Sequence, residues 1–385
     1  MHDLLQELGW DIVREQSPNE PGKRSRLWSH EDINNVVKKN MGTDSIQGMV
    51  MELTKLQVAH WKPEAFSNLS QLSLLHICNV DLPDGLTCLS NSLRILEWTG
   101  YPLRSLPQNF EADELIELNL CHRNIEQLWK GTKNFEKLKF IKLCHSQKIV
   151  ETPDLAGVQN LETLDLEGCS HLVRIHQSLG FLKKLIVLNL KDCKSLESLP
   201  SRIEMESLET LILSNCSKVK KITEFVGNME RLLVLCLDET AIEELPVSIE
   251  RLSSLVSLNL SNCRNLINVR VMDCFEETDV NSGSAIEMSS THDRKKKRER
   301  SNLSRMQSSL AIFIKVLAFW IGEKSEYRAK EFPLAYITKS EYRAKEFPLA
   351  YITKSEYRAK EFPLAYITKS QYRANEFPLA YIWSV

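Results

Sequence analysis

The 385-residue sequence lacks the features that mark several common protein classes. Its ten cysteines form no CxxC pair and no Cys/His cluster with the spacing of a zinc site. No G-x-x-x-x-G-K-[ST] loop is present to bind nucleotide phosphates. The apolar segment Leu310 to Ile321 has 12 residues, whereas a membrane span needs about 20. The sequence therefore predicts no metal site, no phosphate-loop enzyme and no membrane anchor.

Strong net charge and an export signal are also missing. The formal net charge is −2, so the overall charge does not predict a nucleic-acid or membrane partner. The N-terminal residues MHDLLQELGW contain no basic region followed by an apolar one, which a secretory signal needs. We therefore predict a cytoplasmic protein in a reducing compartment, with cysteines that are free thiols.

A leucine repeat dominates the middle of the chain. The frame Leu-x-x-Leu-x-Leu recurs from residue 72, sometimes with Ile or Trp in place of a leucine. Successive copies start 21 to 24 residues apart, at Leu72, Leu93, Leu115, Leu138, Leu161, Leu185, Leu208, Leu232 and Leu255. Such a period is typical of leucine-rich repeats, in which each copy forms one turn of a solenoid.

The spacing within a copy predicts a short strand with two different faces. Because strand side chains alternate, Leu164 and Leu166 point into the core, whereas Asp165 and Glu167 point outward. One turn cannot bury enough apolar surface to fold alone, so the turns must stack on their neighbours. The predicted fold class is α/β: a curved parallel-sheet solenoid of about nine turns, with a small N-terminal helical segment and an irregular C-terminal tail.

The outward strand positions form the predicted binding face. They mix charged, amide, hydroxyl and a few apolar side chains, and no catalytic arrangement of His, Asp and Ser emerges among them. Such a surface favours a protein partner over a small-molecule substrate, and no cofactor is predicted. The predicted contact residues are Glu97, Thr99, Asn119, Lys142, Asp165, Glu167, Asn189, Lys191, Ile212, Ser214, Asp238, Asn259 and Ser261.

A small polar or sulfur side chain follows each strand, where the backbone turns. Its predicted role is structural, because it can hydrogen-bond backbone groups that have no strand partner. These turn positions are Asn124, Cys169, Cys193, Cys216, Thr240 and Cys263. Cys121 and Cys144 instead fall on the outward strand face, where a reactive thiol is the alternative to a structural role.

The N-terminal segment adds a family resemblance. Helical spacing of apolar residues predicts a helix over residues 1–15, and a second helix is predicted from Glu31 to Val37. The segment MHDLLQELGWDIVREQSPNEPGKRSRLW, followed by turns containing NLCHRNIEQLWKG and LNLKDCKSLESLP, resembles plant intracellular immune receptors. These receptors are of the nucleotide-binding, leucine-rich-repeat type with a Toll/interleukin-receptor (TIR) domain. The resemblance covers roughly residues 1–270.

This resemblance implies the recognition and autoinhibition region of a defence receptor, with a pathogen effector, a host factor or a nucleotide-binding module as partner. In the family a Met-His-Asp motif senses ADP, which implies the same role for Met1, His2 and Asp3. Since the phosphate loop is missing from this sequence, we expect no ADP binding here. The NAD-cleaving TIR domain is also missing, so no enzyme is predicted. The alternatives are a truncated, inactive or decoy product, or part of an ADP-binding switch.

The composition divides the chain into four regions. Residues 1–45 resemble the end of a nucleotide-binding module, and residues 46–270 form the solenoid. Residues 271–323 are a linker that contains the basic run Arg294 to Arg300, a pattern typical of a nuclear-import signal, a nucleic-acid-binding patch or a solvated charged stretch. The segment Leu310 to Ile321 predicts a buried or partner-docking helix. Residues 324–385 repeat KSEYRAKEFPLAYIT every 15 residues, and we expect them to be poorly ordered.

Overall fold

The computed structural model describes residues 2–122, 125–227, 229–267 and 286–287, and the side chains of residues 6–267 within these ranges. The helices are α1 (His2–Gln16) and α2 (His30–Lys38), with shorter 3-10 turns η1 (Pro21–Lys23), η2 (Gln177–Phe181) and η3 (Val247–Arg251). The strands are β1 (Arg26–Leu27), β2 (Gly48–Val58), β3 (Leu74–Asp81), β4 (Ile95–Thr99), β5 (Glu117–Asn119), β6 (Phe140–Lys142), β7 (Thr163–Asp165), β8 (Val187–Asn189), β9 (Thr210–Ile212), β10 (Val234–Cys236), β11 (Ser257–Asn259) and β12 (Ile286–Glu287).

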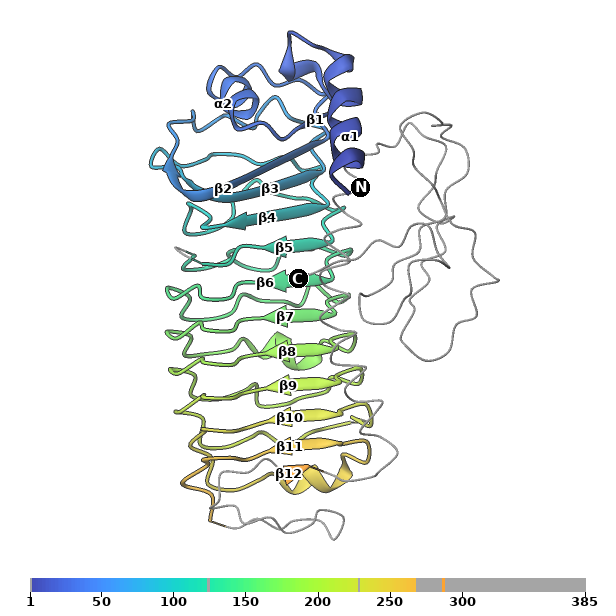
Figure 1. The fold of residues 1–385 in the computed structure, drawn as a ribbon. Helices are drawn as coiled ribbons and strands as arrows, with labels where there is room; N and C mark the ends of the chain where they lie inside the picture. Colours follow the sequence, from blue (N-terminus) through green and yellow to red (C-terminus); the bar gives the residue numbers. More distant parts are fainter. Residues whose placement is uncertain (1, 123–124, 228, 268–285, 288–385) are drawn as a thin grey trace, which may run out of the picture. The chain divides into compact units, whose positions relative to one another are not determined.

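The strands form one sheet in which sequence order and spatial order are the same (Figure 1). Neighbours from β1 to β11 are parallel, and β12 pairs antiparallel with β11. The nine leucine copies supply β3 to β11, one strand per turn, and the sheet continues through β2 and β1 on the other side. The predicted leucine-rich-repeat solenoid is therefore confirmed.

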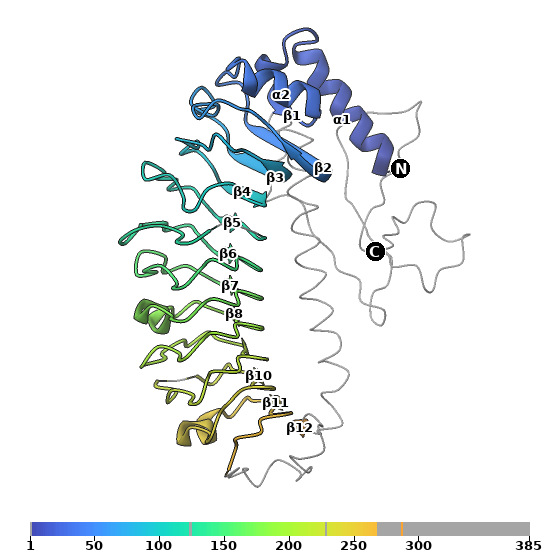
Figure 2. The ribbon, with the colours of Figure 1, turned by 90° about the vertical axis from the view of Figure 1, so that its left-hand side faces the viewer.

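The middle leucine of each copy forms the core of the stack. Leu164 of β7 lies beside Leu188 of β8, which in turn lies beside Leu211 of β9. The side chains of this inner row are 0–4% exposed, from Leu75 in β3 to Leu258 in β11. In Figure 2 the strands line one side of the stack, and η2 and η3 lie on the opposite, outer side. Regular leucine spacing thus places every strand in the same register.

One residue in each turn adopts a left-handed backbone conformation. In the turns of β3 to β11 this residue has a φ between 56° and 81°, at Asn79, Gly100, His122, His145, Gly168, Asp192, Asn215, Glu239 and Asn262. Asn, Asp, His and Gly are the residues that enter this region most readily. Gly168 is required for a second reason, because a Cβ there would lie 2.2 Å from His145 Nδ1. Glu239 is the exception among these left-handed residues, because Glu is not one of those residue types.

The turn positions follow directly after this column. The thiols of Cys169, Cys193, Cys216 and Cys263 each lie 3.1–3.3 Å from the carbonyl of a leucine in the preceding turn, at Leu143, Leu166, Leu190 and Leu237. Ser146 occupies the same position one turn earlier, which the sequence interpretation missed, and donates to Leu120 O at 3.4 Å. Thr240 differs, because it donates to Leu237 O of its own turn. Asn124 lies outside the described residues.

Both predicted N-terminal helices are present. Helix α1 belongs to a different compact unit from the solenoid, so each is described by itself. Helix α2 begins after Ser29, whose hydroxyl accepts a hydrogen bond from Asp32 N, as expected for an N-cap serine. The basic run at residues 294–300, the segment 310–321 and the repeats at 324–385 lie outside the described residues.

A candidate partner-binding face

The strand register places outward side chains in three columns across the sheet. Each column crosses β3 to β11, because equivalent residues of neighbouring strands lie side by side. The middle column is His76, Glu97, Asn119, Lys142, Asp165, Asn189, Ile212, Cys236 and Asn259. The thirteen predicted contact residues come from this column and from the column that follows the strands, so the structure brings them onto one face.

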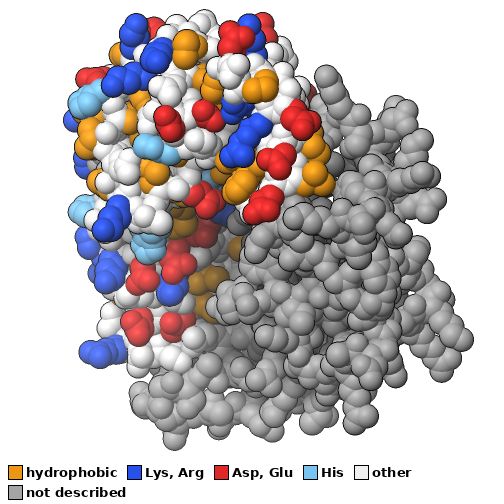
Figure 3. Space-filling view, turned by 45° about the horizontal axis from the view of Figure 1, so that its top comes forward, with side chains coloured by type: hydrophobic (Ala, Val, Ile, Leu, Met, Phe, Trp, Pro, Cys, Tyr) orange, Lys and Arg blue, Asp and Glu red, His pale blue; other side chains and the backbone are white. Residues whose placement is uncertain are grey.

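These residues differ in how much surface they offer. Most are half-buried by their neighbours along the column, and Lys191 is exposed. Glu97 is 8% exposed, because His76 covers it through a hydrogen bond of 2.8 Å. Glu97 therefore lies on the predicted face but exposes little of its side chain. Acidic, basic and apolar side chains are interspersed over the described surface seen in Figure 3.

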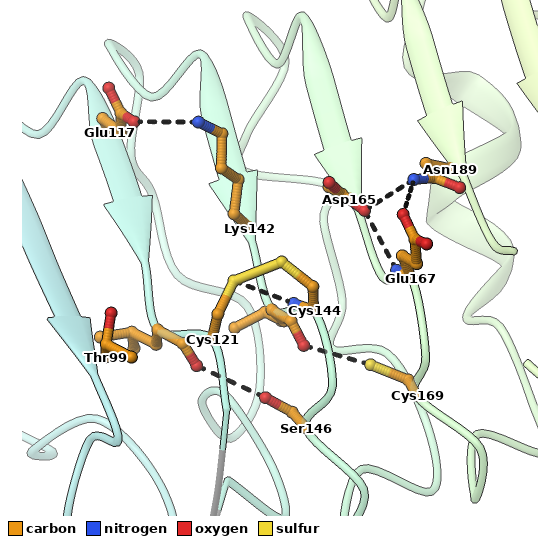
Figure 4. The surroundings of a disulfide bond; sticks show 12 residues. Thr99, Glu117, Cys121, Lys142, Cys144, Ser146, Asp165, Glu167, Cys169 and Asn189 are labelled. Atoms are coloured by element: carbon orange, nitrogen blue, oxygen red, sulfur yellow. Dashed lines mark hydrogen bonds and ion pairs between the residues drawn. A yellow bond between two sulfur atoms is a disulfide. The ribbon is translucent and has the colours of Figure 1, made fainter. Parts of the chain in front are cut away.

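A polar network connects β7 and β8 at the centre of the face (Figure 4). The Asn189 amide donates to Asp165 Oδ1 at 3.0 Å and to Glu167 Oε2 at 3.2 Å. Lys191 Nζ donates to Glu167 Oε1 at 3.1 Å. Burial raises the pKa of Asp165 above its ordinary range, and the nearby Glu167 charge acts in the same direction. The network therefore holds a carboxylate in a site that does not favour its ionised form.

Two further polar contacts extend along the same face. Lys142 Nζ lies 3.5 Å from Glu117 Oε1, and the Glu117 side chain is only 4% exposed. Asp238 Oδ1 accepts hydrogen bonds from Ser214 at 2.7 Å and from Asn259 at 2.9 Å. The charged side chains are thus held in place by neighbours on adjacent turns before any partner arrives.

The remaining column, at the start of the strands, was missed. Five of its nine members are half-buried apolar residues, Leu74, Ile95, Phe140, Val187 and Val234, and the others are Glu117, Thr163, Thr210 and Ser257. The signal was present, because strand alternation also places the residue before the middle leucine on the outer face. The face therefore combines an interrupted apolar stripe with a polar network, and of the apolar side chains on this face the sequence interpretation had named only Ile212.

Cys121 and Cys144 are joined by a disulfide across neighbouring turns (Figure 4). The prediction of free thiols throughout is wrong for this pair, and their reactive-thiol alternative is wrong with it. Both residues follow the third leucine position of consecutive copies, and stacking brings their Cα atoms to 4.7 Å. The next residues, His122 and His145, stack their rings at a centroid distance of 4.9 Å. The sequence contained a signal for this disulfide, because Cys121 and Cys144 occupy the same position in two consecutive copies of the repeat.

Among the described residues, no group of His, Cys, Asp and Glu side chains is arranged to hold a metal ion. The side chains of His2 and Asp3, at the start of α1, lie outside the described part of the chain. Within that described part, no helix combines the length and apolarity needed to cross a lipid bilayer.

Sequence comparison finds relatives of this chain among plant proteins. The chain is 41% identical to disease resistance protein RPP2A of Arabidopsis thaliana over 203 residues, which are 51% of this chain and 15% of RPP2A. It is 41% identical to disease resistance protein RPV1 of Vitis rotundifolia over 212 residues, 48% of this chain and 15% of RPV1. Its relatives are plant disease resistance proteins. The resemblance noted from the sequence is thereby confirmed, and the matched part is about one sixth of each relative's length or less.

A third relative, disease resistance protein RRS1 of Arabidopsis thaliana, is 35% identical over 223 residues, 52% of this chain and 16% of RRS1. Protein-family models give no match. Solved structures similar to the chain include the leucine-rich repeat domain of the type III effector XopL, with 17% identity, a TM-score of 0.39 and coverage of 67% of this chain and 87% of that one. Another is a leucine-rich-repeat protein of Leptospira interrogans, with 20% identity, a TM-score of 0.33 and coverage of 62% and 70%.

Proposed function

We propose that this chain is the recognition region of a plant immune receptor, and that it binds a protein partner through the outward face of β3 to β11. The observation that carries the proposal is the alignment of three side-chain columns on one open sheet face. A pathogen effector, a host factor or a nucleotide-binding module is the proposed partner, and autoinhibition of a receptor is the proposed consequence. The proposed location is the cytoplasm, with nuclear entry through Arg294 to Arg300.

The composition of the face supports a protein partner. Protein interfaces combine an apolar centre with polar groups that fix orientation. Here the stripe containing Ile95, Phe140 and Val187 runs beside the network of Asp165 and Asn189. A sheet face that crosses so many turns offers a long continuous surface to a macromolecule.

The electrostatics of Asp165 support the same assignment. Burial raises its pKa, so keeping the carboxylate ionised at neutral pH reduces the stability of the fold. Perturbed carboxylates of this kind concentrate at functional sites. A basic or amide group of a partner would compensate this cost by completing the hydrogen bonding of Asp165 and Glu167. We therefore place the centre of the proposed interface at β7 and β8.

Site-specific photocrosslinking in leaf extract tests this assignment. A photoreactive side chain is placed on the face at Thr163 or Asn259, and at matched outer positions Phe181 in η2 or Glu250 in η3. We expect the two face positions to yield the same crosslinked protein, and the outer positions to yield none of it. The recovered protein, once purified, should bind the wild-type chain and should bind Glu167→Lys at least about tenfold more weakly, since reversing the charge that faces a basic or amide group of the partner costs a few kcal/mol.

Equal crosslinking from the face and the outer positions would contradict the proposal. So would unchanged affinity of Glu167→Lys. Calorimetric titration of the purified chain with ADP and with NAD provides a further check, because we expect no saturable binding of either nucleotide. Saturable binding would assign the chain to a nucleotide-driven class.

A further inference from the structure

A second group of side chains lies at the β3 end of the outward face and does not take part in the polar network. His76 Nδ1 lies 2.8 Å from Glu97 Oε2 on β4. The other ring nitrogen of His76, Nε2, lies 3.5 Å from Cys78 Sγ. The imidazole therefore connects a carboxylate on one side to a thiol on the other. This order of groups is the one that activates a nucleophilic cysteine.

The surroundings of Cys78 complete the site. Thr99 Oγ1 lies 3.6 Å from Cys78 Sγ, and its hydroxyl can donate to a thiolate there. Glu52 Oε1 of β2 lies 3.4 Å from His76 Nε2. Cys78 is half-buried and His76 retains 21% of its side-chain exposure, so small molecules can reach the group from solvent. The charged groups that face the thiol thus come from three strands: Glu52, His76 and Glu97.

The protonation states follow from these contacts. Burial lowers the pKa of His76, but hydrogen bonds with Cys78 and Glu97 outweigh it and raise that pKa to about 10. The hydrogen bond from His76 lowers the pKa of Cys78 below that of an ordinary thiol. Contact with the imidazole therefore favours the thiolate of Cys78 relative to an ordinary thiol, and the thiolate is the nucleophilic form of cysteine.

We propose that Cys78 is a reactive cysteine that small, uncharged hydroperoxides oxidise to a sulfenic acid. The preference for an uncharged oxidant follows from the charges around it. Glu52 and Glu97 outnumber the single positive charge of His76, and with the thiolate they repel anionic electrophiles such as oxidised glutathione. Hydrogen peroxide is neutral and small enough to reach a half-buried sulfur atom.

The reaction needs no group that is missing from the site. The Cys78 thiolate attacks one peroxide oxygen, so that an S–O bond forms as the O–O bond breaks. The sulfur is oxidised by two electrons and the peroxide is reduced. The leaving oxygen departs as hydroxide and takes the proton of the His76 imidazolium, which yields water and a neutral imidazole. Thr99 can hydrogen-bond the peroxide during this step. The product is Cys78 sulfenic acid.

Three other described cysteines, Cys169, Cys216 and Cys88, differ from Cys78. Burial raises the pKa of Cys169 and of Cys216 to about 12, which suppresses their thiolates. Cys88 is half-buried like Cys78, but the described residues supply it with no hydrogen bond or ion pair. Cys88 is therefore the matched internal control.

Mass spectrometry of the full chain measures both cysteines in one sample. At pH 6.5 we expect iodoacetamide to label Cys78 at least about tenfold faster than Cys88, because only about 1% of an ordinary thiol is ionised there. Between pH 6 and pH 8 the rate at Cys78 should rise less steeply than that of an ordinary thiol, which gains about 75-fold over this range. Hydrogen peroxide followed by dimedone should place the adduct on Cys78 in preference to Cys88.

Substitution separates activation from simple accessibility. We expect His76→Gln to slow the labelling of Cys78 about tenfold at pH 6.5 with circular dichroism unchanged, and Cys88→Ser to leave it unchanged. Equal labelling rates of Cys78 and Cys88 in the wild-type chain would overturn the proposal. So would a labelling rate at Cys78 that rises with pH as steeply as that of an ordinary thiol. A glutathione adduct that forms faster than the sulfenic acid would overturn the choice of oxidant. None of these outcomes depends on the proposed protein partner.

Discussion

The first and last turns of the solenoid reach the same fold with different side chains. At the N-terminal end, β2, β3 and β4 have 11, 8 and 5 residues, and the core contains Trp61, Phe66, Trp98 and Tyr101. From β7 to β11 every strand has 3 residues, and the core is built from leucine with a column of turn cysteines.

The two ends share the backbone conformation of each turn, whereas their core side chains differ. Trp98 stands where the other copies have their third leucine, and its ring makes edge contacts with Trp61, Phe66 and Tyr101 at 5.6–6.5 Å. The left-handed residue nevertheless recurs at both ends, at Asn79 as at Asn215. The fold therefore requires the buried middle residue of each strand and the left-handed residue of each turn. The other core side chains can be aromatic or aliphatic.

The largest expected effect is the loss of an aromatic ring from the N-terminal turns. Trp98→Ala should lower the free energy of unfolding by about 3–5 kcal/mol, because it removes the ring shared by three aromatic contacts. Leu188→Ala in β8 should cost about 2–5 kcal/mol and less than Trp98→Ala. Urea unfolding followed by circular dichroism measures both, with exposed Val150→Ala as the control. A larger loss for Leu188→Ala would show that the aromatic end is the weaker one.

The disulfide between these two regions should have the next largest effect. Cys121 and Cys144 are 23 residues apart, so closing this loop stabilises the fold by up to about 3 kcal/mol. Under oxidising conditions the double substitution to serine should lower the free energy of unfolding by that amount. With a reductant present, the wild type and the double variant should unfold with the same free energy. An equal loss under both conditions would mean that packing, and not the cross-link, accounts for the difference.

The turn cysteines of the C-terminal region should have a smaller effect. Cys193→Ala removes a buried thiol whose hydrogen bond to Leu166 O is 3.3 Å long, and should cost about 1–2 kcal/mol. Cys193→Ser should cost less, because its hydroxyl can keep this bond as Ser146 does in its own turn. Chemical denaturation measures the free energy of unfolding of both variants. Equal losses of stability would show that the hydrogen bond to Leu166 O does not contribute.

The smallest effect concerns the outward face, and it depends on pH. The folded pKa of Asp165 is raised above its ordinary value of 3.8, so its contribution to stability is present below that value and is lost as pH rises through the folded pKa. Asp165→Asn keeps an acceptor for Asn189 without the charge. We expect this variant to be more stable than the wild type at pH 7, with the difference closing as pH falls to about 4. If the stability difference between Asp165→Asn and the wild type widened as pH fell, the raised pKa of Asp165 would be contradicted.

The leucine period predicted the solenoid, the number of copies and the outward face, because strand alternation fixes side-chain direction wherever Leu-x-Leu is regular. It did not predict the burial of Glu97, since the covering residue, His76, lies 21 residues away on another strand. The Cys121–Cys144 disulfide was missed for a similar reason: it needs the distance between neighbouring turns, which the sequence supplies only once the register is known. The long strand β2 lies before the first copy, where no leucine frame marks it.

Hydrogen exchange of the full chain tests most directly whether each turn is held by its neighbours. The amides of Leu143, Leu166, Leu190, Leu213 and Leu237 donate to carbonyls of the next turn at 2.8–2.9 Å. We predict that these amides are protected together and exchange at least about 1,000-fold more slowly than amides of the outer turns, because exposing one requires opening a whole turn. Fast and unrelated exchange at these five positions would contradict the stacked solenoid and, with it, the aligned binding face.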